Sequence, residues 1–178
     1  MTGAEGKADP ERFHALRIWK SLDHDRRLKA AASFWKSPAV KPPEIDIAAA
    51  LLAQSLRFRP QSIKSAPLPK RASYLAGYAG MPDHLAANIL FAYHLAHQIP
   101  MMARFLDLLG IAHEEGRIQD ETPKQEAAKL APAAAKLYEE FDPRDVTIYL
   151  ETLVSQDDET WGALAEVLPA HESRGSKP

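Results

Sequence analysis

Three histidines have the type and spacing that can support metal or acid–base chemistry. His94 and His97 stand three residues apart, so on a helix they share one face, and His113 follows in the next segment. Two imidazoles at this spacing, with a third ligand from a neighbouring element, can bind zinc or iron or act as general bases. One hypothesis is therefore a metal or small-ligand site at these three residues. The alternative is that they are partly buried and hydrogen-bonded for structural reasons.

A basic segment carries a second kind of binding chemistry. It contains Arg57, Arg59, Lys64, Lys70 and Arg71, with aromatic and proline residues between the charges. Guanidinium and ammonium groups bind carboxylates and phosphates. The segment therefore predicts a surface for an acidic protein or another anionic partner. The alternative is that its charges are solvated or pair with acidic residues elsewhere in the chain.

The charge of the chain is strongly divided along its length. The formal charge is −2 over 178 residues. Residues 1–71 hold fourteen Lys and Arg against seven Asp and Glu, while the remainder holds eight against seventeen. Such asymmetry favours either a basic binding surface or two halves that attract each other.

The segment after these basic residues resembles the helix-turn-helix of bacterial repressors. In residues 75–90, Ala76 takes the small position of the first helix, Gly80 takes the turn, and Ala86 and Ile89 take buried positions of the second helix. The resemblance implies a DNA-binding regulator with this element at residues 70–90. Against it, Asp83 would repel phosphate, and residues 72–103 contain no Lys or Arg.

Several classes of function are excluded or disfavoured by what the sequence lacks. There is no cysteine, no glycine-rich nucleotide cradle and no nucleophile elbow. No apolar run is long enough for a membrane span, and the N-terminus does not read as a secretory signal. We therefore expect a non-catalytic cytosolic interaction or regulatory module with no cofactor and no membrane partner.

Prolines and apolar spacing predict the elements that position these residues. Proline fits the first turn of a helix, where its missing N–H would be unpaired anyway. Six prolines or proline pairs indicate helix starts, and five residues are predicted helix caps. The predicted starts are Asp9-Pro10, Pro42-Pro43, Arg59-Pro60, Met81-Pro82, Thr122-Pro123 and Asp142-Pro143, and the predicted caps are Asp9, Asp23, Thr122, Asp142 and Asp157. Pro132 should kink or split the helix that contains it.

The apolar residues recur with the 3.6-residue period of a helix along the chain, and alternating strand patterns are absent. Residues 82–98 are apolar on nearly all sides, which is typical of a central helix. The sequence therefore predicts an all-α fold, a compact bundle of about eight or nine short helices around a central apolar helix at 82–98. We expect one domain over 9–168, with flexible tails at 1–8 and 169–178.

Overall fold

Three aspartates cap helices at positions predicted from the sequence. Asp23 accepts a hydrogen bond from the backbone N–H of Arg26, and Asp142 accepts from two N–H groups of the next turn. Asp157 caps its helix in the same way. Each oxygen satisfies a backbone donor that has no partner within the helix.

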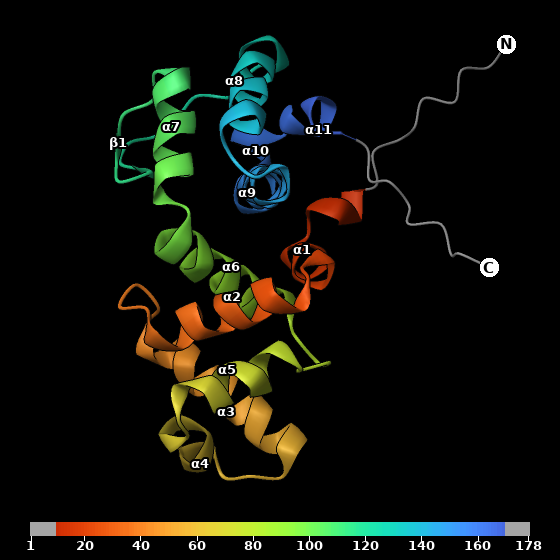
Figure 1. Cartoon of the computed structure of the whole chain (residues 1–178), viewed down its shortest axis with the longest axis vertical. Coiled ribbons are helices and arrows are strands. Elements are labelled where there is room, and N and C mark those ends of the chain that lie inside the picture. Colours follow the sequence, from red (N-terminus) through yellow and green to blue (C-terminus); the bar gives the residue numbers. More distant parts are fainter. Residues whose placement is uncertain (1–9, 170–178) are drawn as a thin grey trace, which may run out of the picture.

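A computed structural model describes residues 10–169 of the chain (Figure 1). The fold is all-α, as predicted, apart from one two-stranded antiparallel hairpin that the sequence did not predict. The elements are η1 (Pro10–Phe13), α1 (Ala15–Ser21), α2 (His24–Lys36), α3 (Pro42–Leu56), α4 (Pro60–Ser65), α5 (Leu68–Ala76), α6 (Asp83–His97), α7 (Ile99–Leu109), β1 (His113–Glu114), β2 (Arg117–Ile118), α8 (Ala127–Glu140), α9 (Pro143–Gln156), α10 (Asp158–Trp161) and α11 (Leu164–Val167).

Helix α6 is the central helix, in agreement with the sequence prediction. Leu85, Ala86, Ile89 and Leu90 are completely buried along it. It packs against α1, α2 and α9, and it lies between α2–α5 in the lower half of Figure 1 and α7–α11 in the upper half. Burial of these apolar side chains is the main force that stabilises the fold.

Two apolar clusters flank this centre. The first is built from α1–α6 and includes Trp19 and Trp35, while the second is built mainly from α7–α11 and includes Met102 and Trp161. The two clusters are tied together because Ile148 of α9 packs into the first and η1 packs against α9 in the second. Trp19, Trp35 and Trp161 are all buried in these clusters.

Polar contacts reinforce the junction between the two halves. The Arg26 guanidinium on α2 donates to Asp145 Oδ1 at 2.9 Å and to Asp142 Oδ1 at 3.2 Å, both from α9. It also pairs with Asp23 on its own helix. In addition, Arg12 lies 3.5 Å from the buried carboxylate of Glu151 on α9. The basic N-terminal part and the acidic C-terminal part therefore do attract each other, through these two arginines.

The predicted helix start at Thr122-Pro123, before α8, was wrong. Thr122 is not a helix cap, because residues 119–126 form a loop and α8 begins only at Ala127. This loop is fixed instead by the backbone N–H of Gln125, which donates to the Thr160 carbonyl at 2.9 Å. Pro132 does not split α8, which continues through it.

The chain termini lie largely outside the described part of the structure. The predicted cap at Asp9 and the predicted tail at 1–8 fall outside the described residues. Of the predicted tail at 169–178, only Pro169 is described, and its carbonyl accepts a hydrogen bond from Arg12 at 2.8 Å. Between residues 10 and 169, no helix combines the length and apolar character needed to cross a membrane.

Candidate functional site

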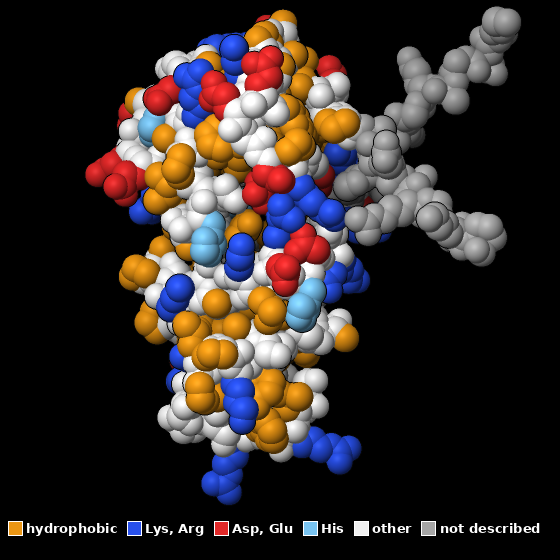
Figure 2. All heavy atoms as spheres, in the orientation of Figure 1, with side chains coloured by type: hydrophobic (Ala, Val, Ile, Leu, Met, Phe, Trp, Pro, Cys, Tyr) orange, Lys and Arg blue, Asp and Glu red, His pale blue; other side chains and the backbone are white. Residues whose placement is uncertain are grey.

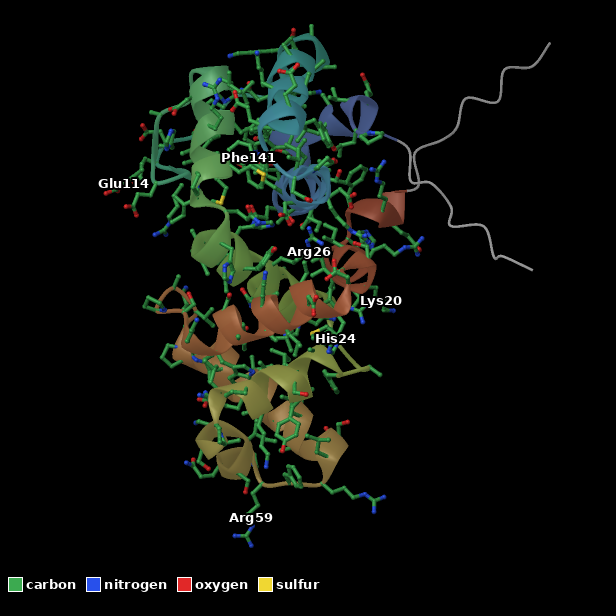
Figure 3. All side chains as sticks on the ribbon, viewed as in Figure 1. Lys20, His24, Arg26, Arg59, Glu114 and Phe141 are labelled. Atoms are coloured by element: carbon green, nitrogen blue, oxygen red, sulfur yellow. The ribbon has the colours of Figure 1, made fainter. Side chains whose placement is uncertain are left out.

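Three of the five predicted basic residues lie at one end of the molecule, where α3 turns into α4. The turn is made by Arg57, whose φ of 56° and ψ of 40° place it in the left-handed region, and its N–H bonds to the Ala53 carbonyl. Arg57 and Arg59 are exposed, and Figure 3 shows Arg59 projecting away from the end of the molecule. Lys64 on α4 is exposed as well and pairs with Asp46 at 2.7 Å.

Exposed apolar side chains flank these arginines along the chain. Leu56 is 37% exposed and Phe58 49%, and with Ile47 at 39% they are the only exposed large hydrophobic side chains in the described part of the chain. Ile47 lies nine residues before Leu56 on α3, on the opposite side of that helix. The Phe58 ring is held edge-on against Tyr74, at 6.1 Å between ring centres. We call the surface formed by Leu56, Arg57, Phe58, Arg59 and Lys64 the α3–α4 tip.

The α3–α4 tip has no acidic neighbours in the sequence beyond Asp46. Residues 47–82 contain five Lys and Arg and no Asp or Glu. On the face shown in Figure 2, blue side chains project from the lower end, whereas acidic side chains gather over the middle and upper half. Within residues 10–169, no ion pair joins the basic segment to the acidic C-terminal part. Arg57 and Arg59 therefore face solvent, and Lys64 pairs locally with Asp46.

The other two basic residues have different surroundings. Arg71 is partly buried, and its guanidinium lies 5.6 Å from the centre of the Trp35 ring. The Trp35 indole N–H donates to the Arg71 carbonyl at 3.0 Å, so this residue joins α2 to α5. Lys70 is exposed on α5. The structure thus places Arg57, Arg59 and Lys64 together and assigns Arg71 a packing contact.

The three predicted histidines do not converge. His97 is exposed, with its ring 5.4 Å from that of Tyr93. His113, on the hairpin, bonds to Asp107 at 2.7 Å and accepts from the Gly116 N–H. His94 is buried on α6. The described residues contain no group of three His, Cys, Asp or Glu side chains that could hold a metal ion.

His94 is a neutral, buried histidine with one unused ring nitrogen. Its Nε2 lies 3.0 Å from the Thr152 hydroxyl, and that hydroxyl donates to the Ile148 carbonyl at 2.7 Å. Because the threonine proton is already donated, Nε2 must carry the imidazole proton and Nδ1 the lone pair. Nδ1 has no hydrogen-bond partner among the described residues. Burial lowers the pKa of His94 to about 4.

A cavity of about 280 Å³ lies beside His94, between α6, α7, α9 and the hairpin. Its walls are mostly apolar, and its polar groups come from α6, α9 and β2. The lining residues are Phe91, His94, Leu95, Met102, Leu106, Gly116, Arg117, Ile118, Tyr149, Thr152, Leu153 and Gln156. We call this the His94 cavity.

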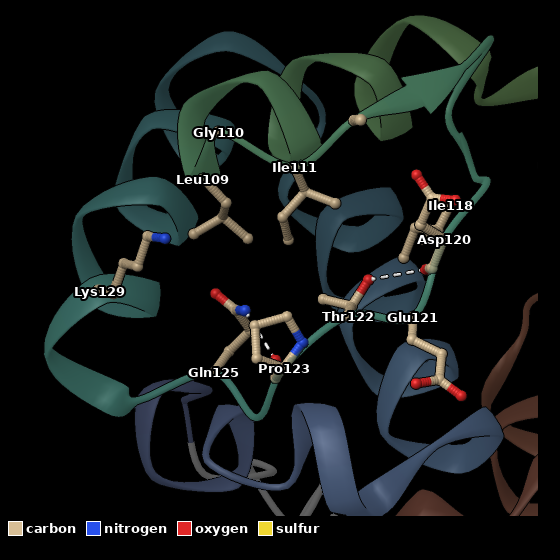
Figure 4. Close-up of a pocket in the computed structure, with 11 residues that line it drawn as sticks. Leu109, Gly110, Ile111, Ile118, Asp120, Glu121, Thr122, Pro123, Gln125 and Lys129 are labelled. Carbon is tan, nitrogen blue, oxygen red and sulfur yellow. Dashed lines mark hydrogen bonds between the residues drawn. The ribbon is translucent and has the colours of Figure 1, made fainter.

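A second hollow of about 270 Å³ lies at the C-terminal end of α7 (Figure 4). The Gln125 side chain points into it, near Leu109 and Lys129. Its amide Nε2 donates to the Pro123 carbonyl, while Oε1 has no partner among the described residues. The walls of this hollow come largely from the irregular loop before α8.

The helix-turn-helix resemblance falls on residues already used for packing. Asp83 accepts a hydrogen bond from the Leu16 N–H at 3.0 Å and so binds the start of α1. Asn88 donates to Glu44 on α3 at 3.0 Å. A recognition helix must enter a DNA groove, but α6 is packed between neighbouring helices. We therefore do not propose DNA binding through α6.

Several residues that define the site regions could not be singled out from the sequence. Thr152 and Tyr149 lie on α9, more than fifty residues from His94 of α6 along the chain. Phe58 was visible as an aromatic among the arginines, but its exposure was not.

Comparison with known proteins found no matching family model, no matching curated protein and no matching solved structure.

Proposed function

We propose that this protein is a helical interaction module that binds an acidic partner protein through the α3–α4 tip. The observation that carries the proposal is the coincidence of exposed apolar and basic groups. Two of the three exposed large hydrophobic side chains of the described residues, Leu56 and Phe58, lie in the same turn as Arg57 and Arg59. Contiguous exposed apolar groups rimmed by charge are typical of protein–protein contact sites.

The backbone at Arg57 supports a binding role for this side chain. A helix that ends in the left-handed region usually has glycine there, because a Cβ atom is disfavoured in that conformation. Arg57 occupies the position at φ 56° instead. A strained, exposed arginine at the apex of a turn is consistent with selection for contact rather than for stability.

The chemistry of the tip favours a protein over a nucleic acid. The arginines could bind either the carboxylates of a protein or the phosphates of a nucleic acid. The aliphatic side chain of Leu56, however, gains nothing from a phosphate backbone and does not stack on bases as an aromatic ring does. A partner segment with carboxylates beside leucine or phenylalanine side chains could contact both the basic and the apolar side chains of the tip.

The test is a titration of the full chain with synthetic peptides, followed by calorimetry. The probe peptide alternates Glu or Asp with Leu or Phe. One control peptide replaces the acids by Lys, another replaces the apolar residues by Ser, and a single-stranded oligonucleotide is the third ligand. We expect the probe peptide to bind at least tenfold more tightly than each of the three controls.

Matched variants locate the binding. Arg57→Glu/Arg59→Glu reverses two exposed charges at the tip, and Lys124→Glu/Lys129→Glu reverses two exposed charges near α8. The first variant should abolish binding of the probe peptide and the second should leave it within about twofold. Equal effects of the two variants, preference for the oligonucleotide, or no binding of the probe peptide would each refute the proposal.

A further inference from the structure

We propose that the His94 cavity binds a small, neutral apolar molecule that carries one hydrogen-bond donor, of the phenol class. This inference is independent of the α3–α4 tip. The cavity lies between α6, α7, α9 and the hairpin, whereas the tip is formed by α3 and α4 at the lower end of the molecule (Figure 1). The proposal depends on three features: a largely apolar cavity, a buried histidine nitrogen without a partner, and the charge of the cavity walls.

The cavity is large enough for more than bound water. It is about 280 Å³ and partly open to solvent, far more than a single water molecule needs. Apolar side chains such as Leu95, Leu106 and Ile118 line it. An apolar body of the size of a substituted benzene ring would make packing contacts with these side chains.

One polar atom at this cavity is buried without a protein partner. His94 is 4% exposed, and its Nδ1 accepts no hydrogen bond from the described residues. The ring of Tyr149, which also lines the cavity, meets the His94 ring edge-on at 5.7 Å. Buried polar groups in native proteins are nearly always paired, so the unpaired Nδ1 indicates that something else pairs with it.

The protonation of these groups defines the polar end of the ligand. His94 donates through Nε2 to Thr152, so Nδ1 can only accept. The Tyr149 hydroxyl can donate or accept. A ligand hydroxyl can donate to the histidine and accept from the tyrosine. A carboxylate has no proton to donate to Nδ1, and Arg117, the one fully charged lining residue, is exposed to solvent and therefore attracts an anion weakly. An ammonium group finds no compensating charge, because the lining residues include Arg117 and no Asp or Glu.

The hairpin forms one wall of the cavity. Gly116, at φ 79°, lies so close to α7 that an added Cβ would stand 2.6 Å from the Cβ of Met102. The backbone of the turn therefore rests directly on a residue of the cavity wall. This contact requires glycine both for its positive φ and for its lack of a side chain.

The test compares three probes on the full chain: p-cresol, toluene and benzoate. Calorimetry should show p-cresol binding about tenfold more tightly than toluene, the effect of one neutral hydrogen bond. Benzoate should bind more weakly than p-cresol by at least the same factor. In His94→Phe, which removes the acceptor, p-cresol and toluene should bind with equal affinity.

A second variant keeps the test decisive if His94→Phe does not fold. Leu95→Trp places a large ring at a partly exposed wall position, and it should abolish p-cresol binding by filling the space. Arg57→Glu/Arg59→Glu should bind p-cresol as tightly as the unmodified chain, which separates this inference from the function of the tip. Equal affinity of the unmodified chain for p-cresol and toluene, or no binding of either, would overturn the proposal.

Discussion

Two buried titratable groups should make the stability of this protein respond to pH in opposite directions. Burial lowers the pKa of His94 to about 4. Burial also raises the pKa of Glu151 to about 7, and the nearby Arg12 opposes that rise only in part. Because each pKa differs between the folded and unfolded chain, the free energy of unfolding depends on pH through both groups.

The direction of each effect follows from which state binds protons more tightly. The unfolded chain protonates His94 near pH 6.5 and the folded chain near pH 4, so this residue stabilises the fold above pH 6.5 and loses that contribution as pH falls. The folded chain protonates Glu151 near pH 7 and the unfolded chain near pH 4.5. Glu151 therefore contributes stability below pH 4.5 that is lost as pH rises through 7. Between pH 7 and pH 5 each effect amounts to about 2 kcal/mol, with opposite sign.

Urea unfolding at pH 7 and pH 5, followed by tryptophan fluorescence, separates the two effects. The unmodified chain should change by less than about 1 kcal/mol, because the two contributions cancel. Glu151→Gln removes one titration and should lose about 2 kcal/mol on going to pH 5. His94→Gln keeps a donor for Thr152 and should gain about 2 kcal/mol over the same interval. If both variants showed the same small change between pH 7 and pH 5 as the unmodified chain, the opposite pKa shifts assigned to His94 and Glu151 would be refuted.

Three further substitutions test other parts of the structure by urea unfolding. Arg26→Met should lower the free energy of unfolding by about 2 kcal/mol, because it breaks partly exposed charge-assisted bonds between α2 and α9; a loss below about 0.5 kcal/mol would contradict that role. Gly116→Ala should cost about 2 kcal/mol or more, since its new Cβ would collide with Met102, and an unchanged stability would show that the hairpin does not rest on α7. Arg57→Gly should raise the free energy of unfolding by about 1 kcal/mol, because glycine removes the strain of a left-handed residue; a destabilised variant would contradict that account.

Helix starts and the central helix could be predicted because their causes are local. An aspartate before a helix satisfies backbone donors two and three residues away, as Asp23 and Asp142 do. The apolar residues on nearly all sides of α6 can likewise be recognised in a single stretch of sequence. These interactions need no information about the rest of the fold.

The segment after α7 could not be predicted because its structure depends on distant contacts. Thr122-Pro123 has the local pattern of a helix start, but the loop is held by Gln125 bonding to Thr160, thirty-five residues away. The hairpin turn depends on Glu115 and Gly116 at positive φ and on the close approach to α7. Tertiary contacts override local propensity here.

The candidate sites show the same division between local and distant causes. The basic segment was visible in the sequence, yet only the fold separates Arg57 and Arg59, which face solvent, from Arg71, which packs on Trp35. The sequence likewise paired His94 with His97 by their spacing. In the fold, His94 is instead coupled to Thr152 and Tyr149 of α9.

The most direct test of the central claim is a nuclear magnetic resonance titration of the isotope-labelled full chain with the acidic, apolar probe peptide. The account predicts that the backbone amide signals that shift most belong to residues 47–64, with the largest changes at Arg57, Phe58 and Arg59. Signals of α8 and α11 should stay unchanged. Shifts concentrated elsewhere on the molecule, or no shifts at saturating peptide, would contradict the assignment of the α3–α4 tip as the interaction surface.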